Sequence, residues 1–109
     1  MSEENEPWKS SMEINEIIHS PIRFSILLFL LHRSWTRYVD IRNNLDITSG
    51  NLTSHLKKLE AAQLVETEKS FDDAKPVTML IITERGRQAV IDYSKQMYKL
   101  LGDVLNKRK

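Results

Sequence analysis

The chain has 109 residues, 40 % of them hydrophobic, a length at which one hydrophobic core can be buried but two cannot. Lys and Arg number 16 against 15 Asp and Glu, so a net charge of +1 favours neither nucleic acid nor an anionic membrane as partner. The absence of cysteine excludes disulfides, thiolate metal sites and cysteine nucleophiles. We therefore predict a single domain in a reducing compartment.

The longest apolar run, residues 26–31, is far shorter than the roughly 18 to 20 residues that a membrane span requires. The first six residues are acidic, whereas a secretory signal is basic and then apolar. We therefore expect a soluble cytoplasmic protein that does not bind membranes.

Charge is distributed unevenly along the chain. Residues 1–20 carry a net charge of −4, residues 33–58 carry +3 and residues 84–109 carry +4. An acidic head followed by a basic middle indicates that one surface could face phosphate while another does not.

The first two predicted elements are helices. A short amphipathic helix is indicated by apolar residues at near-helical spacing: Trp8, Met12, Ile14, Ile17 and Ile18. Ser20 is a good N-cap and Pro21 fits the first helical position, so a second helix begins there and runs to about His32. Because this second helix has almost no polar face, we expect it to be the most buried element.

A few extended residues around 35–37 precede a short third helix over 38–45, and capping residues at 46–50 separate it from a fourth helix over 49–62. In the fourth helix Leu52, Leu56 and Leu59 stand at i, i+4 and i+7 and form one apolar stripe. The opposite side of that helix carries Gly50, Asn51, Ser54, Lys57 and Lys58.

Two strands are predicted at residues 64–69 and 77–82, with residues 72–76 as the turn of a β-hairpin. Thr83 then caps a last helix from Glu84 to about Leu105. Its apolar residues follow a heptad-like spacing: Val90, Tyr93, Met97, Leu100 and Val104.

Three segments, residues 20–27, 50–60 and 80–87, occur in the order and spacing of a known architecture. Through them about three quarters of the chain, from His19 to about Leu100, resembles the winged helix-turn-helix transcriptional regulators of the MarR and ArsR type. The resemblance implies a mainly α fold with a small β-hairpin wing (α+β) and a long C-terminal dimerisation helix. It divides the chain into an N-terminal dimerisation helix (1–19), a DNA-binding core (20–83) and a C-terminal dimerisation helix (84–109).

The fourth helix suits DNA for a physical reason. A major groove about 12 Å wide admits one helix if its outward face is polar and its N-terminal side chains are short. We expect direct or phosphate contacts from Arg37, Ser49, Gly50, Asn51, Thr53, Ser54, Lys57, Lys58 and Lys75. The alternative for these residues is an ordinary solvated face, and His55 is expected to be a half-buried structural histidine.

The wing is acidic where related proteins present a base. Asp72 and Asp73 occupy the predicted tip with Lys75, and carboxylates near phosphates repel them. We therefore expect only partial wing contact with DNA, through Lys75 and Lys69.

The last helix continues beyond what a winged core can cover, which indicates a homodimer on a palindromic duplex site. The expected interface residues are Trp8, Met12, Val90, Tyr93, Met97, Leu100, Leu101 and Val104. A small-molecule effector is compatible with the resemblance, but the sequence carries no distinctive signature of one.

No catalytic motif, phosphate-binding loop or close histidine pair occurs in the sequence, so we predict no enzymatic activity, no metal and no cofactor. The alternative function is a protein-interaction module, which the near-zero net charge and the acidic wing favour. The salt dependence of duplex binding separates the two.

Overall fold

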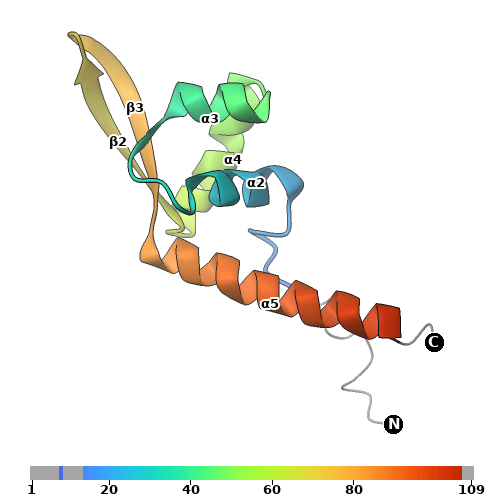
Figure 1. The fold of residues 1–109 in the computed structure, drawn as a ribbon. Coiled ribbons are helices and arrows are strands. Elements are labelled where there is room, and N and C mark those ends of the chain that lie inside the picture. The colour runs from blue at the N-terminus through green and yellow to red at the C-terminus, as the bar shows by residue number, and fades with distance from the viewer. Residues whose placement is uncertain (1–7, 9–13, 107–109) are drawn as a thin grey trace.

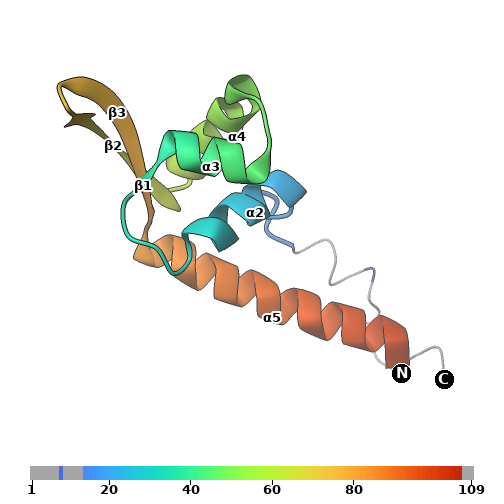
Figure 2. The same cartoon turned by 45° about the horizontal axis from the view of Figure 1, so that its top comes forward.

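The computed structural model describes Trp8 and residues 14–106. Its elements are α2 (Pro21–Leu30), β1 (Thr36–Arg37), α3 (Tyr38–Leu45), α4 (Ser49–Ala61), β2 (Val65–Asp72), β3 (Lys75–Ile82) and α5 (Glu84–Asn106). The predicted mainly α fold with a β-hairpin wing and a long last helix is confirmed. Helices α2 to α4 and the hairpin all lie on one side of α5 (Figures 1 and 2). Within the described residues, no helix combines the length and apolar content that crossing a membrane requires.

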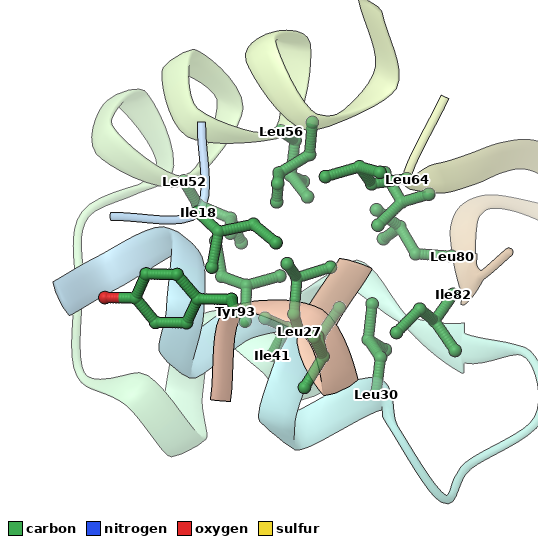
Figure 3. Close-up of a cluster of buried hydrophobic side chains, with 14 residues drawn as sticks. Ile18, Leu27, Leu30, Ile41, Leu52, Leu56, Leu64, Leu80, Ile82 and Tyr93 are labelled. Atoms are coloured by element: carbon green, nitrogen blue, oxygen red, sulfur yellow. The ribbon is translucent and has the colours of Figure 1, made fainter. Parts of the chain in front are cut away.

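Helix α2 forms the centre of the core, as its composition predicts. Ser20 Oγ accepts a hydrogen bond from the Arg23 amide, and Pro21 occupies the first helical turn. The helix buries Ile26, Leu27 and Leu30 and ends at Leu30, slightly earlier than expected. Around it lie buried side chains from the other elements, including Ile41, Leu52, Leu56, Leu64, Leu80, Ile82 and Tyr93 (Figure 3). This core fixes α4 and the hairpin relative to each other.

The sheet has three antiparallel strands in the order β1-β3-β2. Its hairpin turn is shorter than predicted, because Asp72, Lys75 and Pro76 belong to the strands and only Asp73 and Ala74 form the loop. Both loop residues have positive φ, 51° and 66°, the backbone of a two-residue hairpin turn whose twist matches the strands. Pro76 is tolerated in β3 because the short β1 pairs only with Met79 and Leu80.

The prediction of an N-terminal helix is only partly correct. Trp8 is helical, but residues 14–20 form bends and a turn instead of a helix. The Asn15 side-chain oxygen accepts hydrogen bonds from the Ile17 and Ile18 amides, and such local bonding competes with helix formation. Met12 and the rest of the expected helix, residues 9–13, lie outside the described residues.

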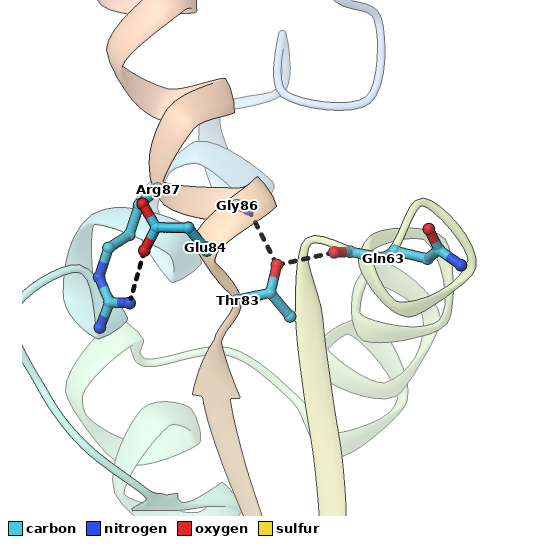
Figure 4. A network of polar contacts seen from close by, with 5 residues as sticks. All are labelled: Gln63, Thr83, Glu84, Gly86 and Arg87. Carbon is cyan, nitrogen blue, oxygen red and sulfur yellow. Dashed lines mark hydrogen bonds and ion pairs between the residues drawn. The ribbon is translucent and has the colours of Figure 1, made fainter.

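The junction between hairpin and α5 is tightly built (Figure 4). Thr83 Oγ1 donates to the Gln63 carbonyl at 2.7 Å and accepts from the Gly86 amide at 2.9 Å, so the predicted cap is confirmed. A Cβ on Gly86 would lie 2.2 Å from the Leu64 carbonyl oxygen, which explains why glycine stands there. Gln63, which follows the C-cap residue of α4, has a φ of 63°, and the Leu64 amide donates back to the Leu59 carbonyl.

Helix α5 has two halves with different surroundings. Val90 and Tyr93 are buried in the chain's own core and Met97 packs against it, so the first part of the expected dimer seam is covered within one chain. Beyond Met97 the helix projects past the core, and Leu101 and Val104 are exposed. A second apolar stripe runs beside the predicted one through Ile91, Tyr98, Leu101 and Leu105.

Candidate nucleic-acid interface

Helix α4 is anchored by its leucines and presents its polar side outward. Leu52, Leu56 and Leu59 are buried, as their spacing predicts, and Thr48 Oγ1 accepts the Asn51 amide at 3.1 Å to cap the helix. The predicted contact residues on α4 are all exposed: Ser49, Gly50, Asn51, Thr53, Ser54, Lys57 and Lys58. The positive end of the helix dipole lies among the short side chains of the first turn.

Helix α3 holds the first turn of α4 through two residues that are not among the expected contact residues, Tyr38 and Arg42. The Tyr38 hydroxyl donates to the Ser49 carbonyl at 2.8 Å and lies 2.8 Å from Thr53 Oγ1. Arg42 Nη1 donates to Ser49 Oγ at 3.3 Å. Thr53 and Ser49 are therefore oriented by α3, whereas no such contact is recorded for the side chains of Asn51 and Ser54 within the described residues. The sequence does offer one signal for Tyr38: it is an aromatic residue with a hydroxyl at the start of α3, a helix expected to pack beside α4.

A hydrogen bond between Arg23 of α2 and His55 connects α4 to α2. Arg23 Nη1 donates to His55 Nδ1 at 3.0 Å, and Arg23 Nε donates to the Ile17 carbonyl at 2.5 Å. Burial, followed by the nearby charges of Arg23 and Lys58, lowers the pKa of His55, so its neutral form is favoured. His55 is half-buried, and the prediction of a structural histidine agrees with this placement.

A charged residue of the wing pairs with one that is distant in the sequence, which residue spacing does not indicate. Arg37, which is expected to contact DNA, forms an ion pair with Asp72 of β2. Lys75 lies opposite the same Asp72 in the strand register. Asp72 raises the pKa of Arg37 by its hydrogen bond and its charge, and Lys75 lies on the same face of the hairpin.

A groove of about 340 Å³ separates α4 from the wing. Helix α4 contributes Thr53, Leu56, Lys57 and Glu60, the strands contribute Thr67, Lys69 and Thr78, and α3 contributes Tyr38. Lysines therefore stand on both walls, which makes the groove suitable for a phosphate backbone.

A family model described as a winged helix DNA-binding domain matches residues 22–101. The chain belongs to this family. An uncharacterised protein of Methanocaldococcus jannaschii is 35 % identical over 85 residues, which cover 78 % of this chain and 92 % of that one.

Solved structures agree with the family. A transcriptional regulator homologue of Pyrococcus horikoshii has a TM-score of 0.80 at 32 % identity, covering 90 % of this winged-helix chain and 96 % of that one. A protein of Porphyromonas gingivalis described as a MarR-family transcriptional regulator has a TM-score of 0.62 at 22 % identity, covering 91 % and 92 % of the two chains. At that identity the second similarity concerns the fold, and it is the fold that the sequence resemblance predicted.

In this winged-helix chain the tertiary structure brings most of the expected contact residues to one side. Helix α4 and the wing lie on the same side of α5 in both views (Figures 1 and 2). Of the expected dimer residues, Trp8 is 60 % exposed, Leu100 is half-buried, and Leu101 and Val104 are exposed on the distal part of α5. The exposed side of α4 and the exposed apolar residues of distal α5 thus lie in different parts of the molecule.

Proposed function

We propose that this winged-helix protein is a homodimeric transcriptional regulator that reads double-stranded DNA in a sequence-specific manner, with α4 in the major groove. The observation that carries the proposal is the division of α4 into a fully anchored leucine side and an exposed side of small polar residues and lysines. Such a surface can approach base edges closely, while Lys57 and Lys58 reach the flanking phosphates. Asn51 and Ser54 read bases, and Tyr38 and Arg42 act as positioning residues for the first turn.

The dimer is supported by the distal half of α5. Tyr98 is 84 % exposed and Leu105 is 64 % exposed, and together with Leu101 and Val104 they form an apolar surface beyond the core. Apolar surfaces of this kind are normally covered. A second copy related by two-fold symmetry would cover it and would place two α4 helices about 34 to 36 Å apart, one DNA turn.

The function is tested by selecting a duplex from a random library and measuring its affinity by fluorescence anisotropy over a salt series. The wild-type chain should show a log–log salt slope of about −0.9 for each phosphate contacted. Replacing Asn51 and Ser54 together by alanine should abolish the preference for the selected site and leave nonspecific affinity intact, at about 1 to 3 kcal/mol per lost base contact.

Lys57→Ala should weaken binding to all duplexes and reduce the slope by about one unit, whereas Lys99→Ala on α5 serves as the matched control and should change neither. A wild-type chain with no duplex affinity at moderate salt would refute the proposal and favour a protein-interaction module.

The dimer is tested separately by sedimentation. Leu101→Glu should convert the chain to a monomer because it buries a charge in the proposed interface, and it should weaken binding to a palindromic duplex more than to a half-site. Exposed Asn106, on another side of α5, provides the control, because Asn106→Glu adds the same charge away from the apolar stripe. A wild-type monomer at micromolar concentration would contradict this part.

A further inference from the structure

The strand register divides the wing into two chemically different faces. Val65 is buried in the core, so alternation along β2 puts Thr67, Lys69 and Phe71 on the same face. Their partners across the register are Leu80, Thr78 and Pro76. Thr67, Lys69 and Thr78 line the groove with α4, which identifies this as the groove face.

The acidic residues of β2 occupy the other face. Glu66, Glu68 and Asp72 alternate with the groove-face residues, and Asp72 is further neutralised by Arg37. Among the described residues that line the groove, Glu60 of α4 carries the single carboxylate. The carboxylates of β2 are therefore directed away from the side on which α4 presents its lysines, whereas Asp73 stays exposed in the loop at the tip.

Phe71 stands at the outer end of the groove face and is 73 % exposed. It stands opposite Pro76, one pair before the end of the strand ladder, so the groove face is apolar near the tip of the wing. No part of the described core covers this ring, although the root of the same strand is buried. An exposed aromatic on a projecting hairpin gains free energy when a partner covers it.

From this placement we infer that Phe71 is the wing's contact with DNA, packing into the minor groove beside the duplex segment that α4 reads, while Lys69 binds the adjacent phosphate. The inference rests on the proposed function and deepens it. Apolar side chains pack against sugars and base edges in the minor groove and wedge at deformable steps, so the wing favours flexible pyrimidine–purine steps at its position. Lys75 shares the face of Asp72 and contributes less than Lys69.

The test compares Phe71→Ala with Phe71→Leu on the duplex selected for the wild-type chain. Phe71→Ala should weaken binding about tenfold at every salt concentration, with an unchanged salt slope, because an apolar contact releases no counterions. Phe71→Leu should retain most of the affinity. Hydroxyl-radical footprinting should show minor-groove protection flanking the α4 contacts in the wild type and its loss in Phe71→Ala.

A lysine pair provides the charge control. Lys69→Ala should weaken binding and reduce the salt slope by about 0.9, and Lys75→Ala should have a smaller effect on both. Wild-type affinity and footprint in Phe71→Ala, or a loss of self-association in sedimentation, would overturn the wing inference while leaving the proposed function standing. Absence of duplex binding by the wild-type chain would overturn both.

Discussion

The two ends of the β2–β3 hairpin are built from the same strands but in opposite environments. At the root, Val65 and Ile82 are buried, and Gly86 of α5 approaches the Leu64 carbonyl more closely than any side chain would allow. At the tip, Phe71 is exposed and the two loop residues have left-handed backbone. The comparison teaches that packing in the core determines which residues stand at the root. At the tip the backbone of the turn constrains the loop residues, and exposed side chains such as Phe71 are free to contact a partner.

The largest expected effect concerns Gly86 at the root. Gly86→Ala should lower the free energy of unfolding by about 3 kcal/mol, because its Cβ would meet a backbone carbonyl that cannot move without displacing β2. The measurement is urea denaturation followed by circular dichroism. Gly102→Ala is the matched control, since nothing lies within 4 Å of its Cβ, and it should raise stability by up to about 1 kcal/mol. Equal stability of the two variants would contradict a close-packed root.

Thr83 should give the next largest effect. Thr83→Val keeps the shape of the side chain but removes both hydrogen bonds of its hydroxyl, to Gln63 and Gly86, at a cost of about 1 to 2 kcal/mol. Thr83→Ser retains the hydroxyl and should lose clearly less. Thermal unfolding of the two variants compares them directly, and identical melting temperatures would show that the cap contributes nothing.

At the tip we expect a substitution that raises the free energy of unfolding instead of lowering it. Ala74 has a φ of 66°, a backbone that glycine adopts without steric cost, so Ala74→Gly should stabilise the chain by about 1 kcal/mol. Ala61→Gly, an exposed alanine at the end of α4, should instead destabilise it by a similar amount. Both variants are measured by chemical denaturation. Destabilisation by Ala74→Gly would mean that the loop does not hold this conformation in solution.

The smallest effect is expected for the ion pair between Arg37 and Asp72. Both side chains are partly exposed, at 42 % and 46 %, so solvent screens their attraction. A double-mutant cycle with Arg37→Gln and Asp72→Asn should give a small coupling energy that declines at high salt. A coupling energy as large as the effect of Thr83→Val would mean that the tip is held as firmly as the root, which would contradict the comparison.

Much of the fold was predictable because its signals are local. Helix α3 and the start of α4 agree with the sequence analysis, since capping residues and the Leu52, Leu56 and Leu59 stripe act within a few turns of chain. The hairpin was predicted, but its turn was placed too broadly, because polar residues and proline at 72–76 favour turns without revealing where strand pairing stops. The second stripe on α5, beginning at Ile91, follows the same heptad spacing and was available to the sequence analysis.

The candidate site was predictable only in part. The exposed side of α4 follows from its periodicity, yet the roles of Tyr38 and Arg42 depend on how α3 packs across it. The pairing of Arg37 with Asp72 joins residues 35 positions apart, and no local pattern indicates it. The division of α5 into a buried and an exposed half likewise depends on where the core ends.

By itself the sequence determined which segments are helices and strands and which side of α4 is polar, because apolar periodicity and capping act over a few residues. Only the tertiary structure decided which charges share a face of the wing, because strand register places residues on one side or the other through pairing between distant segments. For the same reason it alone showed that Phe71 and Lys69 share one face of the wing while the carboxylates of β2 lie on the other.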